Sequence, residues 1–214
     1  MEKSQNKLLK LAVLVLAAGA GSRMGKIKQL LPFRNKSLLT HALDEALAVT
    51  DAVFCVLGAN SEIIQSRLEK DYKPFDKIHV LTNTEWRTGM GSSIKEGVQT
   101  ILKTVALDGI MITLADQPLV DRHFLKKLFE SFRNKPDQVV ASGYAGRNGV
   151  PAIFPKIYFE HLQNLSGDAG ARALLNDSKV PKKVISAKAK LVDIDTYDDY
   201  IQLLQMSANS HLGS

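Results

Sequence analysis

The stretch Leu16-Ala-Ala-Gly-Ala-Gly-Ser-Arg-Met-Gly-Lys-Ile-Lys28 decides the fold, because it places a glycine-rich turn directly after the apolar run Leu11–Leu16. Glycine has no Cβ, so the backbone N–H groups of such a turn can converge on an anion. Arg23 and Lys28 add positive charge to the same region. This combination indicates a phosphate site, for which a nucleoside triphosphate is the first ligand to consider. The alternative is a plain strand-to-helix turn with solvated charges.

Two common phosphate-binding patterns do not fit this stretch. The dinucleotide pattern G-x-G-x-x-G needs a glycine where Met24 stands, and its acidic residue about 20 positions further on falls at Asp44 or Glu45, inside a predicted helix. The ATP-type pattern G-x-x-x-x-G-K-[ST] is one residue too long for the Gly21–Gly25 spacing, and Ile27 replaces its hydroxyl residue. The first mismatch disfavours a nicotinamide- or flavin-dependent redox enzyme.

Composition places the chain among ordinary globular domains. It has 214 residues, of which 45% are hydrophobic and 23% charged, enough for one α/β domain with a full core. The single cysteine, Cys55, lies in an apolar run, which excludes an internal disulfide and predicts a small buried side chain.

Charge and hydropathy indicate the cell compartment and the kind of partner that we expect. No apolar run approaches the 18 or so residues that a membrane span needs, and the polar residues 1–10 lack a signal-peptide cleavage pattern, so we expect a cytoplasmic protein without a membrane partner. The net charge of +6 suits an anionic ligand. Because no basic run is interleaved with aromatic residues, nucleic acid is not the expected partner.

Strand-like and helix-like patterns alternate along the first two thirds of the chain. Strands are predicted at Leu11–Leu16, Ala52–Leu57, Ile78–Leu81, Gly109–Leu114 and Gln138–Ser142. Helices are predicted at Ser37–Val49, Ser61–Lys70, Ser92–Leu102 and Asp121–Arg133, with capping residues at Ser37, Asn60 or Ser61, Ser92 and Asp121. Such alternation predicts a mostly parallel sheet covered by helices on both faces, with ligands bound at the carboxyl ends of the strands.

The last third has a different pattern. The segments Val139–Tyr144 and Val150–Phe154 flank a glycine-containing loop and predict a hairpin. Two short strands, Lys183–Ser186 and Lys190–Ile194, are expected before a final helix that begins at Thr196 or Tyr197. No linker or repeat divides the chain, so residues 1–214 are interpreted as one domain.

Three aspartates are candidate metal ligands. Asp116 follows the strand Gly109–Leu114, where a carboxylate can reach a metal held against phosphates, although a turn or helix-cap role is equally compatible with the sequence. Asp193 and Asp195 are two apart in an extended segment, so their side chains point to one face. One of them can also cap the final helix, as can Thr196.

A second small-residue segment opens the third predicted helix. Residues 89–93, Gly-Met-Gly-Ser-Ser, offer an N-terminal geometry that can receive a ribose, a base or a phosphate, and a capped turn is the alternative. The five histidines show no metal-ligand spacing, and no Gly-x-Ser-x-Gly motif is present.

Taken together, these motifs resemble the nucleotidyltransferase family that includes the MobA and MocA proteins of molybdenum-cofactor maturation. The matching segments are residues 16–33, 83–98, 113–118 (TLADQP), 149–154 (GVPAIF), 167–172 (GDAGAR) and 192–196 (VDIDT). They occur in the family's order over nearly the whole chain. GDAGAR and the start Ala17-Ala18-Gly19 resemble the cytidylyltransferase branch, MocA, which favours CTP over GTP.

The resemblance implies a three-layer α/β/α, Rossmann-like fold of the glycosyltransferase-A type. It divides the domain into a nucleotide-binding part, about residues 8–135, and an acceptor-binding part, about residues 136–206. It also implies Mg²⁺-dependent transfer of CMP from CTP to the terminal phosphate of the molybdenum cofactor, a phosphorylated pterin, with release of pyrophosphate. A molybdoenzyme or chaperone is implied as a further partner.

The resemblance also assigns roles to individual residues. It implies that Arg23, Lys28 and Asp116 are catalytic, and that Asp116 and Asp195, with Asp193 as a substitute, hold Mg²⁺. The implied nucleotide-binding residues are Ala17, Ala18, Gly19, Gly21, Arg23, Gly25, Lys28, Asn83, Gly91, Ser92 and Ser93. The implied acceptor-binding residues are Pro151, Asp168 and Arg172.

Two positions depart from the family pattern. Tyr197 and Asp198 stand where relatives often have Pro and Glu, and Val150 stands where relatives often have a polar residue such as His. The resemblance implies that the region around Val150 faces the acceptor, so two alternatives for the function remain open. One is a sugar phosphate or other phosphorylated metabolite as acceptor, and the other is a non-catalytic protein that binds and delivers the cofactor.

Overall fold

The structure is a computed structural model that describes residues 9–188 and 190–209; the remaining residues of the predicted domain lie outside the described part. Its strands are β1 (Leu11–Ala17), β2 (Pro32–Phe33), β3 (Lys36–Ser37), β4 (Val53–Leu57), β5 (Ile78–Thr82), β6 (Gly109–Leu114), β7 (Val139–Tyr144), β8 (Arg147–Pro155) and β9 (Lys182–Ser186). Its α-helices are α1 (Leu38–Leu47), α2 (Ser61–Asp71), α3 (Met90–Thr104), α4 (Arg122–Asn134), α5 (Phe159–Gln163), α6 (Arg172–Asn176) and α7 (Tyr197–Asn209).

Seven of these strands form one sheet in the order β5-β4-β1-β6-β8-β7-β9. The pairs within β5-β4-β1-β6 are parallel, and so is the β7–β9 pair, whereas β8 runs antiparallel to both of its neighbours. The expected mostly parallel sheet is therefore confirmed. Since β7 and β6 both pair antiparallel with β8, they run in the same direction, and the ends of β1, β6, β7 and β9 lie at one edge of the sheet.

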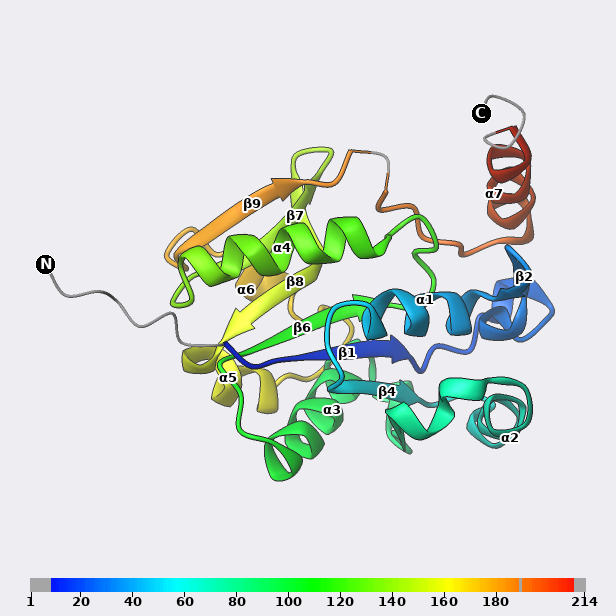
Figure 1. Ribbon diagram of the computed structural model, residues 1–214, viewed down its shortest axis with the longest axis horizontal. Coiled ribbons are helices and arrows are strands. Elements are labelled where there is room, and N and C mark those ends of the chain that lie inside the picture. The colour runs from blue at the N-terminus through cyan, green and yellow to red at the C-terminus, as the bar shows by residue number, and fades with distance from the viewer. Residues whose placement is uncertain (1–8, 189, 210–214) are drawn as a thin grey trace, which may run out of the picture.

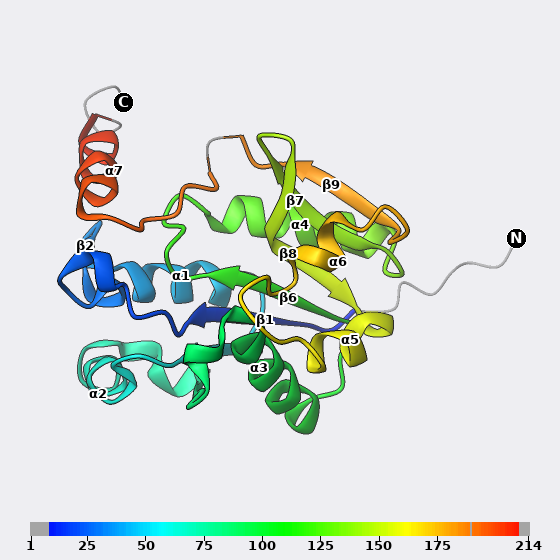
Figure 2. The same ribbon diagram turned by 180° about the vertical axis from the view of Figure 1, so that it is seen from behind.

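Successive side chains of the central strand β1 point to opposite faces of the sheet, and each face carries its own hydrophobic core. Val13 and Val15 of β1 face a cluster that includes residues of α1, α2 and α4, whereas Ala12 and Leu14 face a cluster that includes residues of α3, α5 and α6. Figure 1 shows α1 and α4 in front of the sheet, and Figure 2 shows α3, α5 and α6 on the opposite face. β1 is buried along its whole length, as expected for a central strand covered on both faces.

A third cluster holds the C-terminal helix. Tyr200 and Leu203 of α7 pack with Met24 of the glycine loop and with Phe33 of β2. The Tyr200 hydroxyl donates a hydrogen bond to the Pro32 carbonyl over 2.7 Å. Figure 1 shows α7 standing beside β2, apart from the main sheet, so the C-terminal helix lies against the segment that carries the glycine loop.

Several local predictions are confirmed, two are wrong, and one holds in part, because Asn60 precedes α2 as predicted but its side chain makes no capping hydrogen bond. Ser37 and Asp121 cap α1 and α4 with their side chains as predicted. Ser92 does not cap α3: the helix begins at Met90 after Gly89, whose φ of +108° favours glycine, and the Ser92 hydroxyl donates to the Gly89 carbonyl. The segment Lys190–Ile194 is not a strand, because it leaves the sheet to cross its edge, where Ile194 N–H donates to the Asp116 carbonyl.

We expect the substitution Gly97→Ala to destabilise the protein although it lies inside α3. Helix propensity alone would make alanine more stable than glycine by about 1 kcal/mol. At this position, however, a Cβ would lie 2.5 Å from the Leu14 Cδ1 atom in the buried core, and overpacking of this kind costs about 1–3 kcal/mol. Urea unfolding should show a lower free energy of unfolding for Gly97→Ala, while the exposed control Lys95→Ala stays near the wild-type value. A stabilised Gly97→Ala protein would contradict the packing.

Candidate active site

The glycine loop turns sharply where β1 ends. Gly21 and Gly25 have φ values of +58° and +63°, in the left-handed region, and they bracket a short 3-10 turn at Ser22–Met24. A Cβ on Gly21 would lie 3.0 Å from the Lys28 Cβ atom. The loop therefore requires these glycines for its backbone conformation. It buries Met24 and leaves Arg23 exposed beside the carboxyl end of β1.

A side chain not predicted from the sequence shapes the loop from inside. The Gln29 amide nitrogen donates to the carbonyl oxygens of Ala17 and Gly19, at 2.8 and 2.7 Å. Two acceptors on one nitrogen fix the orientation of the amide, and its own oxygen is buried without a partner. Nothing in the local pattern marks Gln29, because a glutamine between a lysine and a leucine carries no spacing signal.

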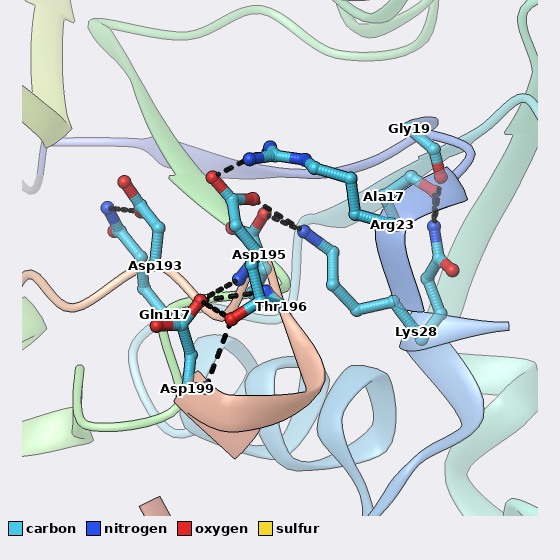
Figure 3. Close-up of polar contacts among 11 residues, drawn as sticks. Ala17, Gly19, Arg23, Lys28, Gln117, Asp193, Asp195, Thr196 and Asp199 are labelled. Atoms are coloured by element: carbon cyan, nitrogen blue, oxygen red, sulfur yellow. Dashed lines mark hydrogen bonds and ion pairs between the residues drawn. The ribbon is translucent and has the colours of Figure 1, made fainter. Parts of the chain in front are cut away.

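Charged side chains from three distant segments meet at the edge of the sheet, as Figure 3 shows. The Lys28 ammonium contacts the Asp116 carboxylate at 2.7 Å and the Asp195 carboxylate at 3.3 Å. The Arg23 guanidinium contacts the other oxygen of Asp195 at 3.2 Å. Two predicted site residues, Asp116 and Asp195, therefore converge on the ammonium group of a third, Lys28, and Arg23 joins them through Asp195.

Lys28 is charged although it is buried, with only 8% of its surface exposed. Burial alone would lower the pKa of its ammonium group, but the Asp116 and Asp195 carboxylates outweigh that effect and raise the pKa above its ordinary value. Lys28 therefore remains protonated throughout the physiological range. It provides a fixed positive charge at the carboxyl ends of β1 and β6.

The carboxylates of this cluster fit a magnesium or manganese ion. One oxygen of Asp116 is buried without a hydrogen-bond partner, and a cavity of about 50 Å³ lies between Asp116, Lys28 and the glycine loop. Within residues 9–188 and 190–209, no three His, Cys, Asp or Glu side chains are grouped to hold a metal by themselves. Mg²⁺ usually takes one or two carboxylates together with substrate phosphates and water, and Asp116 with Asp195 supplies that number.

The structure separates the roles left open for the aspartates. Asp116 does not cap α4, because Asp121 does. The ion pairs of Lys28 within the described residues are with Asp116 and Asp195, whereas the Asp193 carboxylate accepts a hydrogen bond from the Gln117 amide at 2.9 Å. Asp195 is thus the member of the pair that contacts Lys28 and Arg23, which together with Asp116 and Asp195 are called the cation cluster below.

The segment that carries Asp195 is fixed by a capping box at the start of α7. The Asp199 carboxylate accepts hydrogen bonds from the N–H groups of Asp195 and Thr196 and from the Thr196 hydroxyl. In return, the Thr196 hydroxyl accepts from the Asp199 N–H. Thr196 is therefore the capping residue, as one of the sequence alternatives had it. The hydrogen bonds from the Thr196 hydroxyl and backbone lower the pKa of Asp199 below its usual range.

The residues predicted to contact the base or the ribose, near the start of α3, form hydrogen bonds with one another or with a neighbouring loop. The buried Asn83 amide donates to the hydroxyls of Ser92 and Ser93, at 2.9 and 3.0 Å. The Gly91 N–H donates to the Gly167 carbonyl, and a Cβ on Gly91 would lie 2.7 Å from the Ser166 backbone. Asn83, Ser93 and Gly91 are buried, so of this predicted set only Ser92 is partly exposed.

The predicted acceptor-binding residues lie in different surroundings. Pro151 is buried within β8, and Asp168 and Arg172 are exposed. The Asp168 side chain lies against Gly89 at the start of α3. A Cβ added to Gly89 would lie 2.5 Å from the Asp168 carboxylate. The structure therefore places Asp168 beside the residues predicted to bind nucleotide. Their roles as acceptor contacts stay predictions.

Residues 13–183 match the model of the MobA-like NTP transferase domain. The chain belongs to the MobA-like family of nucleotidyltransferases. Among curated relatives, it is 31% identical over 193 residues to the purine catabolism protein PucB of Bacillus subtilis, covering 86% of this chain and 91% of that protein. It is 25% identical over 189 residues to the molybdenum cofactor cytidylyltransferase of Escherichia coli, covering 88% and 92%.

Two solved structures share the fold of this chain. The structure of Rv0371c from Mycobacterium tuberculosis superposes with a TM-score of 0.76 at 27% identity, covering 92% of this chain and 98% of that one. A manganese complex of Rv0371c superposes with a TM-score of 0.71 at 26% identity, with the same coverage. Nucleotidyltransferases of this family use divalent metals.

In the described part of this chain, no helix is long and apolar enough to cross a membrane.

We expect Asp199→Asn to destabilise the start of α7, and the adjacent Asp198→Asn to have little effect. Loss of an N-terminal capping interaction costs about 0.5–2 kcal/mol. Because folding lowers the pKa of Asp199, its contribution is complete above the unfolded-state pKa of about 4 and is lost as the pH falls through the lower, folded-state pKa.

Denaturant unfolding of both variants at pH 7 and at pH 3 measures this contribution. The stability difference between wild type and Asp199→Asn should be larger at pH 7. Equal stability of the Asp198 and Asp199 variants at pH 7 would rule out the capping box as a stabilising element.

Proposed function

We propose that this chain transfers CMP from CTP to the terminal phosphate of the molybdenum cofactor and releases pyrophosphate. The observation that carries the proposal is the contact of the buried Lys28 ammonium with both Asp116 and Asp195, directly beside a glycine-rich loop. Similarity to the Escherichia coli cytidylyltransferase over most of both chains supports the nucleotide and the acceptor. The Ala17-Ala18-Gly19 start of the loop supports CTP over GTP.

Arg23 and Lys28 act on the triphosphate in this proposal. Both cations are held by carboxylates at the mouth of the loop, so their charge is already positioned when the nucleotide binds. Because preorganised cations need little rearrangement, they stabilise the charge that develops on the leaving pyrophosphate. Backbone N–H groups between Ala17 and Gly25 line the phosphates, and Gln29 holds that backbone in place.

In the chemical step, an oxygen of the acceptor's terminal phosphate attacks the α-phosphorus of CTP. A new P–O bond forms, the bond between the α-phosphorus and the bridging oxygen breaks, and pyrophosphate leaves with the electron pair. A phosphate monoester is ionised at neutral pH, since its second pKa is about 6. The step therefore needs positioning and charge neutralisation rather than a general base.

Asp116 and Asp195 hold the divalent metal in this proposal. When bound, the metal neutralises phosphate charge and orients the phosphates for in-line attack. The buried, unpartnered oxygen of Asp116 is the ligand atom that the protein offers without rearrangement.

In this proposal the nucleotide-binding part extends over about residues 8–135 and the acceptor-binding part over about residues 136–206.

Removing the Lys28 charge should lower kcat/KM for CTP by about 10²–10³, the usual effect of losing one preorganised group that stabilises the transition state. The test compares Lys28→Met with Lys26→Met, which removes a nearby exposed lysine, in a steady-state assay of pyrophosphate release. Circular dichroism controls for folding. The Lys26 variant should stay within about threefold of wild type, and a fully active Lys28→Met enzyme would remove Lys28 from the mechanism.

A screen of pyrophosphate release tests the reaction itself. CTP, GTP, ATP and UTP are each incubated with Mg²⁺ or Mn²⁺, with and without the molybdenum cofactor. We expect release from CTP only with the cofactor present, and none after chelation of the metal or in a folded Asp116→Asn variant.

The other outcomes of the screen identify the alternatives. Preference for GTP would overturn the assignment to the cytidylyltransferase branch. Turnover with a sugar phosphate in place of the cofactor would change the acceptor. Binding of the cofactor without pyrophosphate release from any triphosphate would indicate a non-catalytic delivery protein.

A further inference from the structure

The edge of the sheet that carries Asp116 continues into a second hollow, about 690 Å³ in volume, at the far end of the β7–β8 hairpin. It is lined by Gly143, Tyr144, Ala145, Gly146, Arg147, Asn148, Val184, Ser186 and Lys188. Figures 1 and 2 both show the tip of this hairpin beside the end of β9. It is a shallow hollow that is open to solvent rather than an enclosed cavity.

The side chains of this hollow are exposed, and their binding groups are unused. Tyr144 is 48% exposed and Val184 is 42% exposed, so the hollow offers apolar surface to the solvent. Arg147 and Lys188 bring two positive charges, and within the described residues neither side chain forms a hydrogen bond or an ion pair. A hollow that combines an exposed aromatic ring with two cations suits a flat ring with electronegative edges.

The hollow is built into the backbone. Gly143 packs directly on β9, where a Cβ would lie 2.6 Å from the Val184 Cγ1 atom. Near the tip of the hairpin, the Asn148 amide donates to the Leu175 carbonyl, and the Asn176 amide donates to the Asn148 carbonyl. These contacts fix the hairpin to α6, so Tyr144 and Arg147 project from a supported element.

The position of the hollow matches the direction in which the acceptor must extend. The glycine loop and the start of α3 lie on the β1, β4 and β5 side of Asp116, where the nucleotide is proposed to bind. In the proposed reaction the acceptor phosphate lies beside the metal held by Asp116, and the rest of the acceptor extends along the same edge, towards β8, β7 and β9. Lys188 precedes, by a few residues, the segment that carries Asp193 and Asp195 along this edge.

We propose that Tyr144, Arg147 and Lys188 form the subsite that recognises the ring portion of the acceptor, a planar heterocycle with polar edges. Tyr144 stacks on the ring, and Arg147 and Lys188 donate hydrogen bonds to its electronegative edge atoms. This inference rests on the proposed function, because that function brings the acceptor phosphate to the CTP α-phosphorus beside the metal held by Asp116 and Asp195. It makes the hairpin, rather than the buried Pro151, the determinant of acceptor specificity.

The test measures molybdopterin binding by calorimetry without CTP, and separately the KM values for acceptor and CTP. Tyr144→Ala should raise the dissociation constant and the acceptor KM about fivefold to tenfold, and Arg147→Ala combined with Lys188→Ala about tenfold or more. The KM for CTP should not change. Tyr144→Phe should bind almost as wild type, because the ring is kept, and Lys183→Ala is the control for charge, since it lies on β9 outside the hollow.

The outcomes separate this inference from the proposed function. Wild-type turnover with unchanged acceptor KM and affinity in the hairpin variants would overturn the subsite and leave the reaction intact. Hairpin-dependent binding without any pyrophosphate release from CTP would support the subsite and overturn the reaction. A wild-type protein that does not bind molybdopterin would overturn the subsite. A dimer by sedimentation that Tyr144→Ala converts to a monomer, with affinity unchanged, would assign the hollow to self-association and also overturn it.

Discussion

The buried ammonium group of Lys28 is the interaction on which the rest of the site depends. A lysine with 8% of its surface exposed needs carboxylate partners, and it has two, from segments 88 and 167 residues away in the sequence. Removing either carboxylate weakens the stabilisation of a buried charge. Because Asp195 lies after the last strand, the C-terminal segment must return across the sheet edge, which is why residues 190–194 leave the sheet.

Several weaker contacts make that return path specific. The Ile194 N–H donates to the Asp116 carbonyl, so the two carboxylate-bearing segments are joined through their backbones as well as through Lys28. The capping box at Thr196 and Asp199 fixes the backbone beside Asp195. Burial of Tyr200 and Leu203 against Met24 anchors α7 to the same loop that carries Arg23. Helix α7 therefore acts as a support for the cation cluster rather than as part of the main layers.

The chain belongs to the MobA-like family of transferases, and a transferase must bind two substrates. The edge of the sheet offers two regions for them, one on each side of Asp116. On one side are the glycine loop and the tight junction of Gly89 and Gly91 with residues 166–168. On the other side is the β7–β8 hairpin with its exposed aromatic and cationic groups. Lys28 and Asp116 lie between them, and in the proposed reaction bond formation and bond breaking take place there. Positioning and charge, rather than a titrating base, are what this arrangement offers.

The sequence by itself determined the parallel sheet, its principal helices, the glycine loop and the segments carrying Asp116 and Asp195, because hydrophobic periodicity and turn residues are local signals. It could not determine that Gln29 holds the loop, that Asn83, Ser92 and Ser93 bind one another, or that Asp195 rather than Asp193 meets Lys28. Such pairings depend on how distant segments approach, and only burial and the crossing of the sheet edge specify them. The tertiary structure also corrected the strand predicted at Lys190–Ile194 and the cap predicted at Ser92. Both errors arose where a long-range contact, at Asp116 or at Gly167, outweighed the local pattern.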